Sequence, residues 1–236
     1  MQLRHISDQF RSRRVDALNS LLVYGLLPPG AGNIATVVNA ASFNASVAPG
    51  SLISIFGANL AQAAAYAAQI PLPISLADTS VAINGIRAPL LYVSPGQINA
   101  QVPPQSKTGP ATVVVTSSGS ATPAVSFQIA TVAPEIFVSS ATRILALNQD
   151  GTVNGAGNPA ASGSIVTVFL TGQGAITAPA ASIGNLPAQL LYAGPAPETV
   201  GVAQMNMRVP ALLPGDYQLQ VTLGGVASNS GLISID

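Results

Sequence analysis

The chain has 236 residues, of which 48% are hydrophobic and only 7% are charged, and its eight basic and eight acidic side chains give a formal net charge of zero. Soluble domains average about 25% charged residues, so the surface must consist largely of Ser, Thr, Asn, Gln and small apolar side chains. No basic patch is available to neutralise phosphates, which excludes an electrostatic nucleic-acid binder, and the lack of cysteine excludes disulfides, a thiolate nucleophile and a cysteine-ligated zinc site. Zero net charge also removes the repulsion that keeps proteins apart, which favours self-association.

The chain begins with a tail of about thirty residues that differs from the rest. It is charged first, then apolar from Ala17 to Leu27, and it ends at Pro28-Pro29-Gly30. The apolar stretch is about half as long as the ~20 residues that a membrane-spanning helix needs, so no transmembrane segment is predicted, and the tail is expected to be retained rather than cleaved as a signal peptide. The residue pattern of the tail allows either an amphipathic helix over residues 6–24 or an extended strand. As a strand, the tail would present four side chains on one face and could add to the sheet edge of another copy. These side chains are Leu18, Leu22, Tyr24 and Leu26.

A duplicated unit follows the tail. Residues 90–92, Leu-Leu-Tyr, and residues 98–103, Ile-Asn-Ala-Gln-Val-Pro, return as Leu-Leu-Tyr at 190–192 and as Met-Asn-Met-Arg-Val-Pro at 205–210. Further segments match in pairs, 49–56 with 162–169 and 115–119 with 221–225. The repeat therefore predicts two domains after the tail of residues 1–30, one over 31–131 and one over 132–236.

Within each copy the pattern is typical of a β-sandwich, because short runs of β-branched residues are separated by turn residues at intervals of about 8–12 residues. Asn84-Gly85 predicts a type I′ hairpin, since both central residues of that turn need positive φ. The Ala-rich segment 60–69 is an exception and predicts a short helical turn. The short linker 131–134 predicts that the two sandwiches pack end to end. The predicted strands are 51–56, 81–83, 86 onward, 98–102, 111–116 and 125–129 in the first copy, and 136–137, 144–147, 152–153, 164–170, 187–192, 203–209, 217–223 and 231–235 in the second.

Three motifs carry a family resemblance. Asn39-Ala40-Ala41-Ser42-Phe43, the run 49–60 (PGSLISIFGANL) and the run 90–103 (LLYVSPGQINAQVP) resemble the Solibacter-type uncharacterised C-terminal domain family of secreted acidobacterial proteins. The run 147–152 (LNQDGT) is similar to a motif in that family's second half, and each half is similar in fold to IPT/TIG immunoglobulin-like domains. The resemblance covers roughly residues 33–236 and implies an extracellular β-sandwich with an accessory or structural role. No activity is established for that family, so no catalytic residue is carried over from it. In that family the module usually follows a much larger N-terminal portion, so this shorter version is expected to work alone or by joining copies of itself.

Catalytic groups are sparse. The one histidine, His5, lies in the tail, away from the formed site that a Ser-His-Asp triad needs. Paired carboxylates for glycoside hydrolysis must lie about 5–10 Å apart, whereas the acidic residues of the two copies are scattered singly and mostly near turns. They are Asp78, Glu135, Asp150, Glu198 and Asp216. Solvated loop charges are the preferred interpretation, so no catalytic residue and no cofactor is predicted.

One polar segment could supply oxygen ligands to calcium. The ligands would be Asn148, Asp150, Asn154 and Asn158, with Gly151 allowing a tight bend. A single carboxylate compensates the charge of a divalent cation poorly, and Asp-Gly between strands is an ordinary hairpin turn. A turn is therefore the preferred interpretation, and no metal is predicted. The same segment lacks the lysine and the following helix of a phosphate-binding loop.

Three tyrosines could form a platform for sugar rings. They are Tyr66, Tyr92 and Tyr192, of which the last two are equivalent in the repeat and each end a strand after Leu-Leu. Packing in the core or at a sheet edge is preferred, because buried aromatic rings with a polar tip are common there. The absence of tryptophan further disfavours carbohydrate stacking.

The sequence thus predicts an all-β protein of two tandem immunoglobulin-like β-sandwiches behind a short tail. The leading functional hypothesis is a non-enzymatic extracellular structural protein whose partners are copies of itself, such as a filament or surface-layer subunit joined by strand donation from the tail. The alternative is an extracellular adhesion or carbohydrate-binding module at the cell surface, with a surface glycan as its partner. An enzyme is the third possibility and would need two acidic residues assembled in the groove between the domains.

Overall fold

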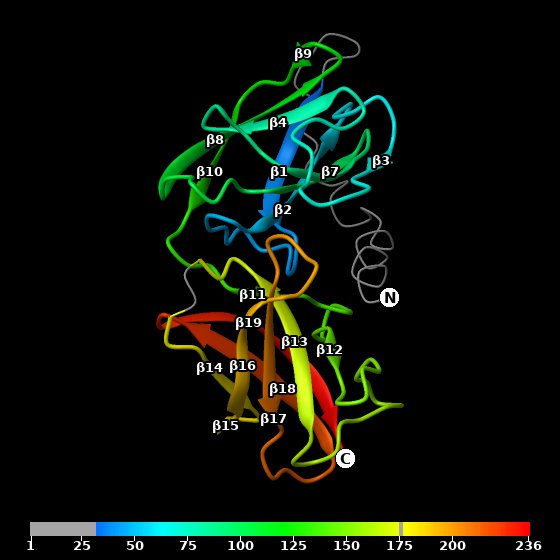
Figure 1. The fold of residues 1–236 in the computed structure, drawn as a ribbon, viewed down its shortest axis with the longest axis vertical. Helices are drawn as coiled ribbons and strands as arrows, with labels where there is room; N and C mark the ends of the chain where they lie inside the picture. The colour runs from blue at the N-terminus through cyan, green and yellow to red at the C-terminus, as the bar shows by residue number, and fades with distance from the viewer. Residues whose placement is uncertain (1–31, 175–176) are drawn as a thin grey trace.

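A computed structural model describes residues 32–174 and 177–236, and every regular element within those ranges is a β-strand. The predicted all-β, immunoglobulin-like fold class is confirmed. Strands β1–β10 form the upper half of Figure 1 and strands β11–β19 the lower half, and they are called the first and the second sandwich below. Within the described ranges, no helix is long and apolar enough to span a membrane.

The strands of the first sandwich are β1 (Asn33–Asn39), β2 (Leu52–Ala58), β3 (Ala65–Tyr66), β4 (Thr79–Ile83), β5 (Ile86–Arg87), β6 (Leu90–Val93), β7 (Gln97–Gln101), β8 (Gly109–Ser117), β9 (Ser120–Ala121) and β10 (Val125–Ile129). Sheet A has the order β1-β2-β7-β6-β3, and sheet B has the order β10-β8-β4-β5, with β9 paired to β8. All of these pairings are antiparallel.

The strands of the second sandwich are β11 (Glu135–Ile136), β12 (Ala146–Leu147), β13 (Ile165–Thr171), β14 (Ala180–Ile183), β15 (Leu186–Pro187), β16 (Gln189–Pro195), β17 (Ala203–Arg208), β18 (Gly215–Leu223) and β19 (Val226–Ile235). Sheet C has the order β11-β13-β17-β16, with β12 also paired to β13, and sheet D has the order β15-β14-β18-β19. Sheet C is therefore the counterpart of sheet A, since β13, β17 and β16 take the places of β2, β7 and β6.

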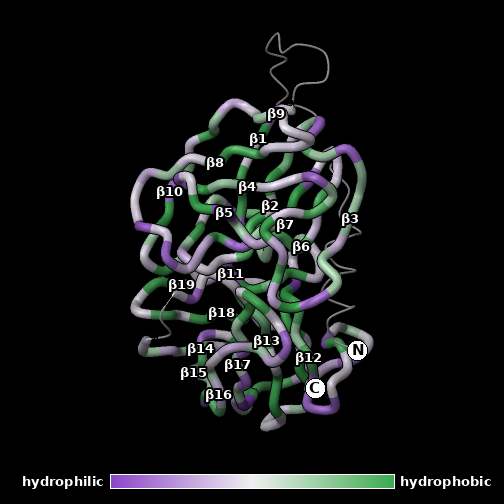
Figure 2. The backbone as a smooth tube through the Cα atoms, turned by 45° about the horizontal axis from the view of Figure 1, so that its top comes forward, coloured by the Kyte–Doolittle hydropathy of each residue, from purple (hydrophilic) through white to green (hydrophobic). Residues whose placement is uncertain are grey.

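Each sandwich encloses its own hydrophobic core. In the first, Ile53 and Ile55 of β2 alternate with outward-facing residues and pack with Ile98 of β7. In the second, Val166 and Val168 of β13 pack in the same way. Hydrophobic residues concentrate in the strands and hydrophilic ones in the outer loops (Figure 2). Each fully buried aliphatic side chain of this kind contributes about 1.5–3 kcal/mol, and period-two alternation selects the buried face of strands such as β8 and β17.

A third apolar cluster joins the two sandwiches. Leu52 of sheet A reaches into it from the outer face of β2, and its N–H donates to Thr171 Oγ1 of β13 at 2.8 Å. Val138 N–H donates to the Ala41 carbonyl at 3.2 Å. At Gly201 (φ 71°) a Cβ atom would lie 2.8 Å from Leu52 Cδ2. The buried members of this cluster, called the junction cluster below, are Ala40, Ala41, Leu52, Phe137, Leu145, Leu147, Phe169, Ala196 and Val202, with Leu91 packed against them. Apolar burial and hydrogen bonds thus hold the sandwiches together.

Two local predictions have opposite outcomes. The hairpin at Asn84-Gly85 is confirmed, because φ is 47° at Asn84 and 79° at Gly85. The helical turn predicted over residues 60–69 is wrong, since that segment contains the strand β3, which pairs with β6. Alanine's helix propensity is worth less than 1 kcal/mol per residue over other common residues, and the hydrogen bonds and ring packing offered by the β6 edge outweigh it.

Other predictions fall beyond what the structure tests. The tail of residues 1–30, with the proposed self-association residues Leu18, Leu22, Tyr24 and Leu26 and with His5, lies outside the described residues. The division into domains 31–131 and 132–236 stays a prediction. The strands of each sandwich fall within one of these ranges.

Candidate binding face

The repeated tyrosine and asparagine of the two copies lie directly opposite each other on neighbouring strands. Tyr192 of β16 pairs with Asn206 of β17, and Tyr92 of β6 pairs with Asn99 of β7. Both tyrosine strands carry a register irregularity just before the tyrosine, between residues 190 and 192 and between residues 90 and 92. A bulge adds one residue to a strand. In both copies it lets the first leucine of the motif, Leu90 or Leu190, pack toward the core while the tyrosine lies on the outer face of the sheet.

An amide pair completes the motif in the second sandwich. Asn206 Oδ1 accepts a hydrogen bond from Thr167 Oγ1 at 3.2 Å and another from Gln204 Nε2 at 2.9 Å. These two bonds use the oxygen of Asn206 and the nitrogen of Gln204. The Asn206 NH₂ group and the Gln204 Oε1 atom have no hydrogen-bond partner among the described residues. One donor group and one acceptor therefore remain for a ligand.

The first sandwich carries the same arrangement in a covered form. Asn99 Oδ1 accepts from Ser54 Oγ at 3.0 Å and from Gln97 Nε2 at 2.8 Å. Asn99 is only 4% exposed, and the Tyr92 ring is packed against the Tyr66 ring with centroids 4.6 Å apart. In the second sandwich Tyr192 is 40% exposed. Thr167, Gln204 and Asn206 are there half-buried.

The accessible arrangement in the second sandwich is called the amide face below. It consists of Thr167, Tyr192, Gln204 and Asn206. Its tyrosine ring is held in place, because Tyr192 Oη donates a hydrogen bond to the Pro195 carbonyl at 2.8 Å. A Cβ atom on residue 194 would lie 2.6 Å from that hydroxyl, so this ring position requires a glycine at residue 194. With its hydroxyl engaged, the ring presents an apolar face to solvent beside the amide groups.

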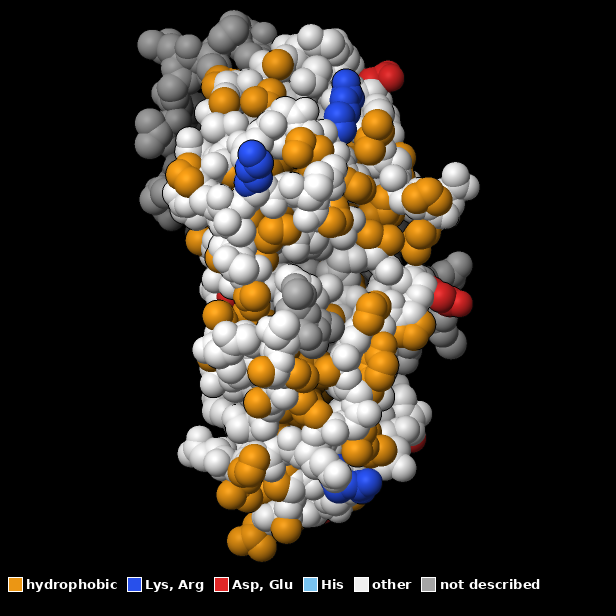
Figure 3. Space-filling model, turned by 60° about the vertical axis from the view of Figure 1, so that its left-hand side comes forward, with side chains coloured by type: hydrophobic (Ala, Val, Ile, Leu, Met, Phe, Trp, Pro, Cys, Tyr) orange, Lys and Arg blue, Asp and Glu red, His pale blue; other side chains and the backbone are white. Residues whose placement is uncertain are grey.

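The amide face is almost free of charge. Its neighbour along β17 is the exposed Arg208, which donates to the Gly163 carbonyl at 2.8 Å. The view in Figure 3 shows a surface of polar uncharged and hydrophobic side chains with only scattered charged ones. A ligand at this site would be held by hydrogen bonds and apolar contact.

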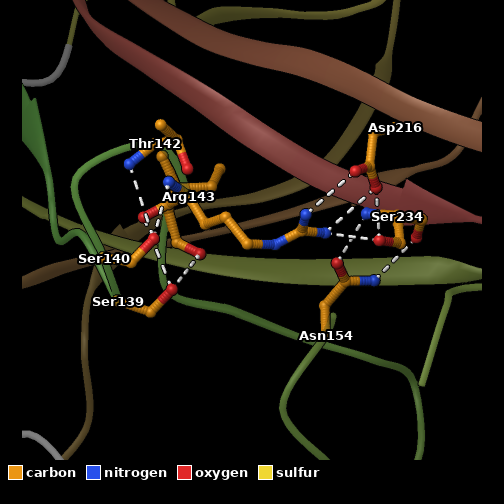
Figure 4. Close-up of polar contacts among 8 residues, drawn as sticks. Ser139, Ser140, Thr142, Arg143, Asn154, Asp216 and Ser234 are labelled. Carbon is orange, nitrogen blue, oxygen red and sulfur yellow. Dashed lines mark hydrogen bonds and ion pairs between the residues drawn. The ribbon is translucent and has the colours of Figure 1, made fainter. Parts of the chain in front are cut away.

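Three of the acidic residues singled out in the sequence, Glu135, Asp150 and Asp216, have separate hydrogen-bond partners. Asp216 accepts hydrogen bonds from both terminal nitrogens of Arg143, at 3.0 and 3.1 Å, and Ser234 also contacts both side chains (Figure 4). The hydrogen bonds from Arg143 and then from Ser234 lower the pKa of Asp216 below its usual value. This network fastens the loop before β12 to strands β18 and β19.

Glu135 differs from the other acids because it is buried beneath the junction. Its Oε2 atom accepts from Asn44 Nδ2 of the first sandwich at 3.2 Å. Burial raises the pKa of Glu135, and this effect exceeds the opposing contributions of hydrogen bonds from Ser42, Asn44 and the Asn229 backbone.

The segment considered for calcium is a hydrogen-bonded turn, as predicted. Asp150 Oδ1 accepts from both the N–H and the hydroxyl of Thr152, which lowers the pKa of Asp150. Asn154 Oδ1 accepts from Ser234 N–H at 2.8 Å, and Asn148 Oδ1 accepts from Asn154 Nδ2 at 3.0 Å. Asn158 directs its NH₂ group to Thr152 Oγ1. Within residues 32–174 and 177–236, no group of three or more His, Cys, Asp or Glu side chains could hold a metal ion.

The tyrosines lie at or next to the sheet edges and outside the hydrophobic cores, which is one of the two placements that the preferred interpretation allowed. Neither Tyr92 nor Tyr192 belongs to a core cluster, and both lie on the outer faces of their sheets, Tyr192 on an edge strand. The sequence reasoning missed Gln204 and Asn206 altogether. The signal was present, because the asparagine recurs at the same place in both copies, as Asn99 and Asn206.

Comparison with known proteins finds a domain-family model that is similar to part of the chain. Residues 36–129 match the model of the IPT/TIG domain, which accords with the sheets of the first sandwich. No curated protein matches the chain.

Several solved structures are similar at low sequence identity. The SGBP-B protein of the mixed-linkage glucan utilization locus of Bacteroides ovatus is 12% identical, with a TM-score of 0.39, over 83% of this chain and 44% of that one. SGBP-B from a xyloglucan utilization locus of Bacteroides uniformis is 16% identical, with a TM-score of 0.29, over 86% and 48%. The γ-CGTase of alkalophilic Bacillus clarkii is 16% identical, with a TM-score of 0.31, over 86% and 24%. The chain thus spans less than half the length of each of these proteins.

Proposed function

We propose that this protein is a non-catalytic extracellular module that binds carbohydrate on the amide face of its second sandwich. The observation that carries the proposal is the exposed ring of Tyr192 beside an amide pair that leaves one NH₂ group and one carbonyl oxygen for a ligand.

The chemistry of the amide face suits a sugar ring. Neighbouring hydroxyls of a pyranose both donate and accept hydrogen bonds, so one can accept from the Asn206 NH₂ group while the next donates to Gln204 Oε1. The C–H groups on one side of the same ring form an apolar surface, which can pack on the Tyr192 ring. The lack of charge fits a neutral glycan, since an ionised ligand would need a counter-charge when it leaves water.

A binding role is favoured over catalysis by the state of the carboxylates. Asp150 is bonded to Thr152, Asp216 to Arg143 and Glu135 to Asn44, each in a different part of the molecule. Hydrolysis of a glycoside uses two carboxyl groups facing one bond. No described acidic residue belongs to the amide face.

An extracellular location is supported by composition and resemblance. The surface has few charges, and residues 39–43, 49–60 and 90–103 resemble a family of secreted proteins. The alternative of a filament joined by tail strands rests on residues outside the described part of the chain, so it stays a hypothesis that deletion of residues 1–30 followed by electron microscopy would test.

Glycan binding can be measured by a glycan array followed by calorimetry with the best neutral oligosaccharide. Replacing Tyr192→Ala should weaken binding roughly tenfold, the equivalent of about 1.4 kcal/mol for a lost aromatic contact. Gln204→Ala should weaken it about fivefold, as expected for one hydrogen bond of ~1 kcal/mol.

Gln97→Ala is the matched control, because Gln97 makes the same hydrogen bond in the covered copy. It should leave the affinity unchanged. Equal losses for Gln97→Ala and Gln204→Ala, or no binding to any glycan on the array, would contradict the proposal.

A further inference from the structure

The outer edge of the tyrosine strand is occupied in the first sandwich and open in the second. In sheet A, β3 pairs with β6 so that Tyr66 lies opposite Tyr92 and Ala65 opposite Val93. Two more hydrogen bonds follow the same edge, from Ala67 N–H to the Leu91 carbonyl at 2.9 Å and from Leu90 N–H to the Pro73 carbonyl at 2.8 Å. In sheet C the order ends at β16, and no strand among the described residues pairs with its outer side.

The open edge is apolar as well as unpaired. Leu191 is 44% exposed and Tyr192 is 40% exposed, whereas the equivalent Leu91 packs against the junction cluster. The strand from Gln189 to Pro195 contains no charged residue, and its one proline is its last residue. Charges, prolines and bulges are the usual devices that keep edge strands from pairing. The bulge of β16 is no obstacle here, since β6 has the same bulge and still accepts β3.

The other long edge of the second sandwich is closed. Strand β19 ends sheet D, and its outer side forms parallel bridges from Leu232 to Arg143 and from Ile235 to Ala160. The Arg143 side chain further ties this covering loop to Asp216 (Figure 4). The chain therefore protects one long edge of this sandwich and leaves β16 exposed.

We infer that the β16 edge pairs with the β16 edge of a second copy, in an antiparallel arrangement with its two-fold axis at Tyr192. This register places the two Tyr192 rings opposite each other, as Tyr66 and Tyr92 lie in the first sandwich. It also places Ala193 of each copy opposite Leu191 of the other, which is the relation of Ala67 to Leu91. The hydrogen bond from Ala67 N–H to the Leu91 carbonyl would recur twice, once in each direction.

A two-fold contact of this kind is self-complementary and closes on itself, so it produces a dimer and no filament. The formal net charge of zero leaves no repulsion to oppose it. An edge-to-edge contact is smaller than the roughly 1,200–2,000 Å² of a stable interface, so the dimer is weak and depends on concentration.

The dimer would have a consequence for binding, although it does not depend on the proposed function. Residues directly opposite each other on paired strands lie on the same face of a sheet. The Tyr192 ring of the second copy would then pack on the Tyr192 ring of the amide face, as the Tyr66 ring packs on the Tyr92 ring, so dimer formation and ligand binding at Tyr192 would compete.

A single introduced cysteine tests the register. The chain has no cysteine, so Tyr192→Cys gives one thiol, and in the dimer its Cβ atom would lie about 4.5–5.5 Å from its symmetry mate, close to disulfide geometry. Mild oxidation should convert most of this variant to a covalent dimer. Leu213→Cys, at an apolar position that is 79% exposed, is the control and should crosslink at least tenfold more slowly.

Sedimentation of the cysteine-free protein tests the association itself. The wild type should show a reversible monomer–dimer equilibrium, and Leu191→Lys should raise the dissociation constant at least tenfold, whereas Leu213→Lys should not. A wild type that stays monomeric at millimolar concentration would overturn the inference. So would a dimer that Leu191→Lys weakens but Tyr192→Cys cannot crosslink, because that result assigns the edge to another strand such as the tail of the second copy.

Discussion

Leu52 and Thr171 are 119 residues apart in the sequence, and they join the two sandwiches through a hydrogen bond of 2.8 Å from the Leu52 N–H to Thr171 Oγ1. The same hydroxyl donates to the Gly201 carbonyl at 2.6 Å. Both residues are buried. One hydroxyl thus satisfies a donor and an acceptor at the junction, and a valine in its place would satisfy neither.

Thr171→Val should lower the free energy of unfolding by about 1–3 kcal/mol, because it leaves the buried Leu52 N–H and the part-buried Gly201 carbonyl unpaired. Urea unfolding followed by circular dichroism measures this. Thr116→Val, at a half-buried strand position of sheet B, should change stability by no more than about 0.5 kcal/mol. Equal effects at the two positions would show that the hydroxyl has no special role at the junction.

Glu135→Gln should stabilise the protein more at neutral than at acidic pH. Burial raises the pKa of Glu135 in the folded state, so the folded protein binds its proton more tightly than the unfolded chain does. Stability is then lost as pH rises from the unfolded pKa through the folded one. The neutral glutamine avoids this loss. The measurement is the difference in free energy of unfolding between variant and wild type from pH 3 to pH 7, and a difference that shrinks as pH rises would contradict the assignment.

Leu91→Ala and Leu191→Ala form a matched pair from the two copies. Leu91 packs against the junction cluster, whereas Leu191 is exposed. For the monomer, Leu91→Ala should cost about 2 kcal/mol, as large-to-small changes in packed sites do, and Leu191→Ala no more than about 0.5 kcal/mol. Thermal unfolding at low concentration, where no dimer forms, separates the two. Similar losses would mean that the junction does not bury Leu91 as described.

Gly201→Ala should be more harmful than Gly50→Ala. Both glycines have positive φ, 71° and 81°, but a Cβ atom at residue 201 would meet Leu52 and the Gly50 carbonyl, while one at residue 50 would meet nothing within 4 Å. Gly50→Ala should show only the backbone strain of about 1 kcal/mol, and Gly201→Ala should add a steric loss that separates the sandwiches. Small-angle scattering and unfolding midpoints report the two effects, and a Gly201→Ala variant as stable as Gly50→Ala would exclude the close approach.

The fold class and most strands can be predicted from the sequence, because the alternation of apolar and polar residues and the preferences of turn residues are local properties. Asn84-Gly85 needs nothing beyond its own φ preferences to form its hairpin. The Ala-rich segment before β6 was misjudged because its structure depends on a distant strand edge.

The candidate site was harder to foresee for a related reason. Tyr92 and Tyr192 stand in the same Leu-Leu-Tyr motif, and only the three-dimensional surroundings make one covered and the other open. Leu91 and Leu191 differ in the same way. The two amides of each pair are two residues apart on one strand, but their position beside the tyrosine depends on cross-strand register, which a single sequence does not contain.

The scarcity of charge described for the surface has a further consequence outside the molecule. Dissolved ions screen charge–charge attraction over about 10 Å at 0.1 M salt, but they leave hydrogen bonds between neutral groups and the contact of apolar rings nearly untouched. Only 7% of the residues are charged. The affinity of this protein for a neutral ligand should therefore change little between low and high salt concentration.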